Sequence, residues 1–99
     1  MQNYLIAGLS DDITATGTRE EWGAYFESLG GSVVDGGHPI APTKAAVRGG
    51  KVSDASDDIM VGYYIIKAES LDAAVALVKQ SPMANNAGCE ARVYELTQM

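Results

Sequence analysis

The clearest periodicity in the chain is helical and lies near the N-terminus. Four apolar side chains recur at intervals of three and four residues and form one stripe of a helix: Trp22, Tyr25, Phe26 and Leu29. Thr18 and Glu21 precede the stripe with the spacing of a capping box, in which each side chain binds a backbone N–H at the helix start. Gly30-Gly31 follows it, and glycine tolerates the left-handed conformation that ends helices. The pattern predicts a helix between these signals.

A second helix is predicted downstream. Ser70 provides an N-cap and Asp72 an acid in the first turn. The apolar stripe again has helical spacing and consists of Leu71, Ala74, Val75 and Val78. Ser81-Pro82 ends this helix, because the residue before a proline avoids the helical conformation.

Extended segments surround these two helices. The strands that we expect are residues 4–9, 32–35, 59–66 and 89–96, and residues 36–42 form a loop with two glycines and two prolines. Residues 45–48 and 51–54 flank Gly49-Gly50, which is typical of a tight hairpin with a primed turn. The order of elements predicts one α+β domain over residues 1–99, a ferredoxin-like βαββαβ fold with an antiparallel sheet and both helices on one face.

The two central strands do not alternate between apolar and polar residues, as strands covered on one side should. Residues 59–66 (IMVGYYII) and 4–9 (YLIAGL) are apolar on both sides. Two helices cover only one face of the sheet, and the chain has no third helix for the other. We therefore expect a homodimer that buries sheet against sheet. The alternative is a monomer that exposes some tyrosine and methionine.

The charge restricts the classes of partner. Seven basic and thirteen acidic residues give a formal net charge of −6, and the basic residues are scattered. Nucleic acids and anionic membranes need clustered lysine and arginine, so we expect neither as a partner. Cys89 is the single cysteine, which fits a reducing compartment. With no signal peptide and no membrane-length apolar run, the expected location is the cytoplasm.

Several segments together resemble the YCII-related domain family, in its DGPF-type branch. They are the opening YLIAGL, residues 22–30 (WGAYFESLG), 35–40 (DGGHPI), 50–54 (GKVSD), 62–74 (GYYIIKAESLDAA), Ser81-Pro82 and 90–93 (EARV). The resemblance covers nearly the whole chain. At the Asp-Gly-Pro-Phe signature of that branch the sequence departs, since Ala55 and Ser56 follow Asp54.

This resemblance implies a ferredoxin-like protomer in a dimeric α+β barrel. Related folds include muconolactone isomerases, cofactor-free monooxygenases and stress-responsive barrel proteins. Members of the wider family are proposed to use a histidine and an aspartate in a cleft. The family itself implies no particular reaction.

His38 is the sole histidine and the first candidate for catalysis. An imidazole exchanges a proton near neutral pH, and Asp35, three residues earlier, can orient it. The alternative is a solvated histidine beside a turn-forming aspartate. A general-base role predicts that His38→Ala abolishes a turnover that survives Lys79→Ala.

Four further residues are candidates for substrate binding. Lys44 and Arg48 can hold an anion such as a carboxylate, or they are ordinary solubilising charges on the hairpin. Tyr63, or its neighbour Tyr64, can present a hydroxyl between helices and sheet, or anchor the core or interface. Trp22 is either core or a flat platform for a ligand.

Cofactor motifs do not occur. One histidine and one cysteine do not make a usual zinc site, and neither nucleotide-binding glycine motif is present, so we expect no metal and no cofactor. Two functions remain. One is a homodimeric domain that binds a small apolar or carboxylate-bearing molecule, with cofactor-free acid–base chemistry at His38 and Asp35. The other is a non-catalytic interaction module. The first predicts a pocket of a few hundred Å³ with His38 at its wall, the second a space filled by Trp22, Tyr25 and Phe26.

Overall fold

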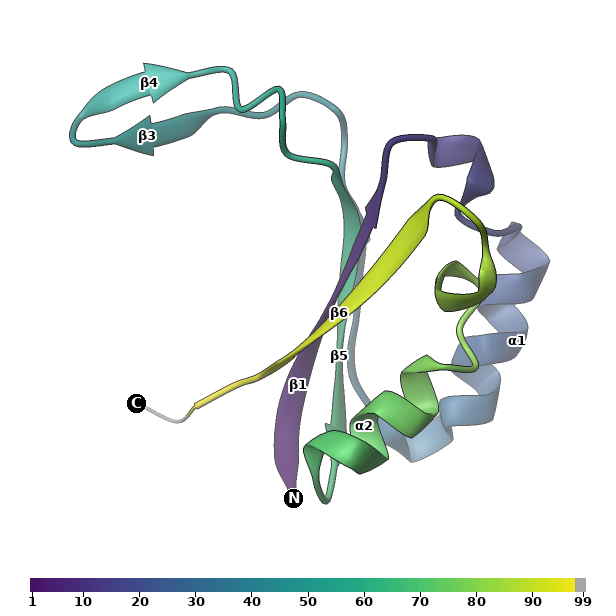
Figure 1. The fold of residues 1–99 in the computed structure, drawn as a ribbon. Helices are drawn as coiled ribbons and strands as arrows, with labels where there is room; N and C mark the ends of the chain where they lie inside the picture. The colour runs from purple at the N-terminus through teal and green to yellow at the C-terminus, as the bar shows by residue number, and fades with distance from the viewer. Residues whose placement is uncertain (98–99) are drawn as a thin grey trace.

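Four strands form one antiparallel sheet in the order β2-β5-β1-β6 (Figure 1). The computed structural model describes residues 1–97. The strands are β1 (Gln2–Ser10), β2 (Val33–Pro39), β5 (Met60–Ala68) and β6 (Cys89–Glu95). Helices α1 (Arg19–Leu29) and α2 (Leu71–Val78) lie on the same side of the sheet. The predicted ferredoxin-like fold, with the first strand and the strand before the second helix at the centre, is confirmed.

Both predicted helix starts are confirmed. The Thr18 hydroxyl accepts from the Glu21 N–H at 3.1 Å, and the Thr18 N–H donates to the Glu21 carboxylate at 2.8 Å. The Ser70 hydroxyl accepts from the Ala73 N–H at 3.1 Å at the start of α2. Short 3-10 turns join the elements: η1 (Ile13–Ala15), η2 (Gly30–Ser32) and η3 (Met83–Asn85).

The loop predicted for residues 36–42 is wrong in its first half, because β2 continues through His38 and Pro39. The register of β2 against β5 shifts between Val33 and Asp35 and again between Asp35 and His38. Gly37 has a φ of +67°, and a Cβ there would lie 1.7 Å from the Tyr63 carbonyl oxygen. The glycine thus allows a close approach that no other residue permits. Pro39 is tolerated because β2 is an edge strand.

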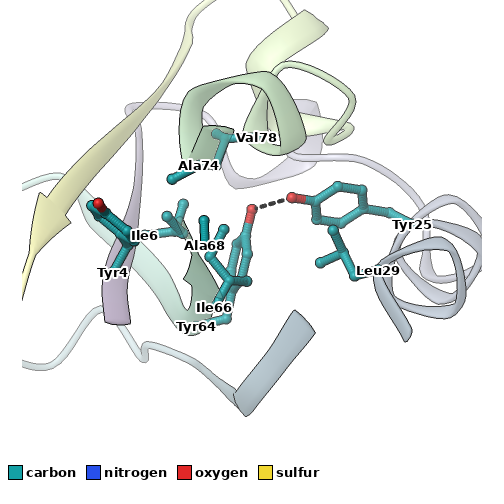
Figure 2. Packing of buried hydrophobic residues seen from close by; sticks show 9 residues of the cluster. All are labelled: Tyr4, Ile6, Tyr25, Leu29, Tyr64, Ile66, Ala68, Ala74 and Val78. Atoms are coloured by element: carbon teal, nitrogen blue, oxygen red, sulfur yellow. Dashed lines mark hydrogen bonds between the residues drawn. The ribbon is translucent and has the colours of Figure 1, made fainter. Parts of the chain in front are cut away.

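The core lies between the sheet and the two helices (Figure 2). Its buried members come from β1, β5, α1 and α2, and are Tyr4, Ile6, Tyr25, Leu29, Tyr64, Ile66, Ala68, Ala74 and Val78. In β1 and β5 these are the even-numbered positions, and Ile6 pairs with Tyr64 and Tyr4 with Ile66. This face is called the inner face below.

The opposite, outer face of the two central strands is also apolar. Its side chains are the odd-numbered ones, namely Leu5, Ala7, Leu9, Tyr63 and Ile65, and the alternation in β5 ends at Val61, where the register against β1 shifts. All but Ala7 are half-buried, and neither helix covers them (Figure 1). The two apolar faces that the sequence predicts are therefore present in the sheet.

The predicted hairpin forms a separate two-stranded sheet of β3 (Ala46–Arg48) and β4 (Lys51–Ser53). Gly49 and Gly50 have φ values of +59° and +77°, as a type I′ turn requires. The hairpin extends from one end of the main sheet toward the side opposite the helices (Figure 1).

Candidate functional site

A cavity of about 360 Å³ lies on the inner face of the sheet, beside α1. Its floor is a row of small or compact residues, one from each strand at the same level. Pro39 pairs with Gly62, Gly62 with Gly8, and Gly8 with Ala91. Larger side chains would fill this level, as Tyr64 and Ile6 fill the next one. The cavity therefore exists because these four positions carry little or no side chain.

Aromatic rings form one wall of the cavity. The ring centroids of Phe26 and Tyr64 lie 5.2 Å apart, and those of Trp22 and Tyr64 lie 6.1 Å apart, both nearly perpendicular. The indole Nε1 of Trp22 donates to the Thr16 carbonyl oxygen at 2.8 Å, which fixes the ring orientation. The rings make an apolar wall, and individual aromatic rings of this kind stack on planar molecules.

The Tyr64 hydroxyl lies behind this wall and is hydrogen-bonded to the Tyr25 hydroxyl at 2.8 Å (Figure 2). Burial raises the pKa of Tyr64 far above its ordinary value, and its hydrogen bond with Tyr25 raises it further. Burial also raises the pKa of Tyr25. Both phenols therefore stay neutral, and the wall carries no charge.

Met83 closes the cavity above the floor. It belongs to η3 and is buried, and a Cβ on Gly8 would lie 2.5 Å from its sulfur atom. The thioether is flexible and polarizable, so it adapts to the shape of a bound molecule. Gly62 differs from Gly8, because a Cβ there would meet its nearest atom only at 3.5 Å.

Two basic residues belong to the cavity lining, His38 on β2 and Arg19 at the start of α1. Both are exposed residues, so they mark the solvent side of the cavity. His38 pairs with Tyr63 in register and its ring lies 6.3 Å from the Tyr63 ring, so the imidazole is on the same, outer side of the sheet as Tyr63. Toward the cavity floor the residue presents its backbone, whose carbonyl oxygen would lie 3.5 Å from a Cβ on Gly62. Arg19 supplies a permanent positive charge with five N–H donors, which suits a carboxylate or a phenolate oxygen.

The predicted site residues divide into two groups. Trp22, His38 and Tyr63 line the cavity, whereas Asp35, Lys44 and Arg48 are not part of its lining. The Tyr63 side chain belongs to the outer face, so only Tyr64 of the two tyrosines turns toward the helices.

The three other residues have different surroundings. The Asp35 carboxylate accepts from the Gly37 N–H at 2.8 Å, and no hydrogen bond joins it to His38 in residues 1–97. The Lys44 ammonium donates to the Asp58 carbonyl oxygen. Arg48 lies in β3, on the projecting hairpin.

Sequence reasoning missed Arg19, Gly8, Gly62, Phe26 and Met83 as lining residues. The two glycines carried a signal, because glycine inside a strand commonly marks a place where a ligand or another backbone comes close. Arg19 was not identified because it lies within the capping sequence, where the start of the helix alone accounts for it.

Within residues 1–97, no group of three or more histidine, cysteine or acidic side chains is arranged to hold a metal ion. Over the same residues, neither helix has the length and hydropathy needed to cross a membrane.

Fold and cavity together define a small α+β protein with a ligand-sized hollow between helix and sheet. Residues 13–97 match the YCII-related domain family, and the chain belongs to that family. No curated protein matches the sequence significantly.

Among solved structures, the chain is similar to 5-chloro-2-hydroxyhydroquinone dehydrochlorinase (TftG) from Burkholderia phenoliruptrix, in complex with 2,5-dihydroxybenzoquinone. The TM-score is 0.62 at 17% identity, and the match covers 98% of this chain and 95% of the other. At this identity the similarity establishes the shared fold.

Proposed function

We propose that this protein binds a small planar molecule with an anionic oxygen in the cavity on the inner face. The observation that carries the proposal is the cavity itself, whose volume of about 360 Å³ lies within the range of ligand sites. In a purely structural module Trp22, Tyr25 and Phe26 would fill this space, and here they leave it open.

The lining indicates the class of ligand. Trp22, Phe26 and Tyr64 offer flat apolar contacts, and Arg19 offers a charge at the solvent side. A single-ring aromatic or quinone with a carboxylate or acidic hydroxyl meets both requirements. The structural relative is described with 2,5-dihydroxybenzoquinone, which is planar and acidic, and this compound is a suitable first probe.

The binding test fills the cavity from its floor. Gly62→Val adds a β-branched side chain that a strand accepts, and its Cβ meets no protein atom closer than 3.5 Å. We expect the wild type to bind 2,5-dihydroxybenzoquinone in calorimetry or by its absorbance, and Gly62→Val to weaken binding at least tenfold while the protein stays folded.

The control is Gly31→Val, where a Cβ meets nothing within 4 Å. Arg19→Gln should lower affinity for the acidic quinone but leave binding of an uncharged quinone unchanged. Equal affinity of wild type and Gly62→Val would contradict binding in this cavity.

His38 is the group that we propose exchanges a proton with the bound molecule. His38 lies at the rim of the cavity on edge strand β2, and imidazole gives and takes protons near neutral pH. Its register with Tyr63 places the ring on the outer side, so the proposed exchange requires this exposed side chain to turn toward the rim. The Asp35 carboxylate fixes the turn before His38 through Gly37, so its proposed role is to position the β2 backbone that carries the imidazole. Neither residue needs a cofactor for this step.

The proton-exchange test measures ring deuteration of 1,2,4-trihydroxybenzene in oxygen-free D₂O. His38 delivers a deuteron to a ring carbon, a C–D bond forms, and the displaced C–H proton returns to the imidazole. We expect the protein to accelerate this exchange and His38→Ala to slow it about 100-fold. Lys79→Ala, on an exposed residue after α2, should match the wild type. Equal rates for both variants would exclude His38.

We further propose that the protein works in the cytoplasm, as one domain over residues 1–99 and as a homodimer joined through the outer sheet faces. The uncovered apolar side chains of β1 and β5 support the dimer. The second candidate function, a non-catalytic module whose dimer surface is its purpose, rests on the same outer face and requires that the cavity bind nothing.

A further inference from the structure

The hairpin of β3 and β4, residues 46–53, stands apart from the rest of the protein. It pairs only within itself and does not join the four-stranded sheet. Val47 and Val52 face each other across the pair and are 69% and 73% exposed. Figure 1 shows it extending beyond the end of the main sheet, on the side of the outer face. These residues are called the arm below.

The arm lacks the contacts that keep such a structure stable. A two-stranded hairpin alone is marginal in water and normally packs on a third element. The whole chain is correspondingly extended: its Cα radius of gyration is 14.3 Å, against about 13 Å for a compact chain of this length. A well-formed hairpin with two exposed valines is therefore suited to packing against the surface of another molecule.

We propose that the arm packs on the outer face of a second copy of this chain. This inference rests on the proposed homodimer and names the element that holds it together. The outer face offers the required apolar surface, with Leu5, Leu9 and Ile65 half-buried and open to a partner. In a two-fold dimer each arm packs on the other protomer, so the two arms make equivalent contacts.

Charge favours a second copy over other partners. The arm contains Arg48 and Lys51 and no acidic residue, so its formal charge is +2. The whole chain carries −6, which leaves −8 on the remainder. Asp35 on β2 and Glu90 on β6 place carboxylates on the two edge strands that border the outer face, and Glu90 also pairs with Arg92 of its own strand. The arm is thus complementary to the body of its own protein in both hydrophobicity and charge.

The first test removes the apolar contact while keeping the hairpin. Val47→Thr/Val52→Thr preserves shape and β-propensity, because threonine is also β-branched. We expect sedimentation equilibrium to show a dimer Kd at least tenfold higher than in the wild type. Leu71→Thr, at a 49% exposed position on the helix side, should leave the Kd unchanged.

Charge reversal tests the electrostatic part of the proposal. Arg48→Glu/Lys51→Glu should raise the dimer Kd at least tenfold in 50 mM salt, and the difference from the wild type should shrink in 0.5 M salt. An unchanged Kd in both double variants would overturn the proposed arm contact. If Ile65→Lys still dissociates that dimer, the dimer forms through the sheets without a contribution from the arm. A wild type that stays monomeric would overturn both, and the binding experiments on the cavity would be unaffected.

A distance measurement locates the contact directly. A spin label on Lys51→Cys in a Cys89→Ser chain is mixed with an unlabelled chain that carries ¹³C-methyl leucines. We expect the Leu5 and Leu9 methyls of the outer face to broaden, and the methyls of Leu29 in α1 to stay sharp. Broadening of Leu29 alone, or none in a mixture that is dimeric, would overturn the arm contact.

Discussion

Ala55 adopts a backbone φ of 51°, in the left-handed region that residues with a Cβ avoid. It follows Asp54 after the hairpin. The Asp54 carboxylate accepts from the Ser56 N–H at 3.3 Å, and the Ala55 carbonyl accepts from the Asp58 N–H at 3.0 Å. The turn therefore keeps the conformation that suits glycine although the residue is alanine.

The strain at this position predicts a stabilising substitution. Ala55→Gly should raise the free energy of unfolding by about 0.5–1 kcal/mol, because relief of the left-handed strain exceeds the added freedom of the unfolded chain. Urea denaturation measures the change. Ala24→Gly, on the exposed side of α1, is the matched control and should lower stability by about 1 kcal/mol. A loss of stability in Ala55→Gly would show that the alanine is unstrained.

At the scale of elements, the hydroxyl pair of Tyr25 and Tyr64 joins α1 to β5 within the core. Burial raises the pKa of both groups, so the folded state keeps protons that unfolded tyrosine loses near pH 10. The stability that results is complete below about pH 10 and falls as the pH rises toward the folded pKa. The contact between α1 and the sheet is therefore sensitive to strong alkali.

Tyr64→Phe tests this dependence. In the wild type each such tyrosine should steepen the loss of unfolding free energy by up to about 1.4 kcal/mol per pH unit above pH 10. The variant should be about 1 kcal/mol less stable at pH 7, since the Tyr25 hydroxyl loses its partner, but its alkaline loss should be shallower. Some slope remains, because burial also raises the pKa of Tyr4. Urea denaturation of both proteins from pH 8 to 11 measures this difference. Parallel plots of unfolding free energy against pH would contradict the prediction.

Elements with a local signal were predictable from the sequence. The capping box of Thr18 and the Gly49-Gly50 turn fix their conformations through neighbouring residues, and both appear as expected. The path of β2 past Asp35 was not predictable. Gly37 and Pro39 are ordinary loop residues by composition, and only the approach of Gly37 to Tyr63 shows why a strand needs them.

The candidate site was predicted only in part, for the same reason. Trp22 and His38 carry chemistry in their side chains, so a sequence can suggest them. Gly8 and Gly62 contribute by having no side chain, and their register across β1 and β5 is a property of the assembled sheet. Asp35 and His38 are close in sequence, which suggested that they pair, but the glycines between them lead the backbone through a shift of register.

At the scale of the whole molecule, the outer face predicts association. Ile65 lies at its centre, between Leu5 on β1 and Asp35 on β2. Sedimentation at micromolar concentration should give twice the 10.4 kDa mass of one chain. Ile65→Lys would place an ammonium in the apolar centre of the interface, where it loses hydration, and it should raise the dimer Kd at least 100-fold.

The control for this substitution places the same charge elsewhere. Leu71→Lys adds an ammonium at an exposed position on the helix side and should leave the dimer intact. The Ile65→Lys monomer should keep its circular dichroism spectrum, which separates dissociation from unfolding. A dimer that persists in Ile65→Lys would place the interface on some other surface.

The floor of the cavity has one more consequence, for the speed and entropy of capture. Gly8 and Gly62 have no side chain that could rotate into the cavity from its floor, so the floor keeps its shape when the site is empty and Met83, packed over Gly8, is the flexible group that adjusts. A ligand therefore binds to a floor that is already formed, and little of its binding energy is spent on ordering the protein.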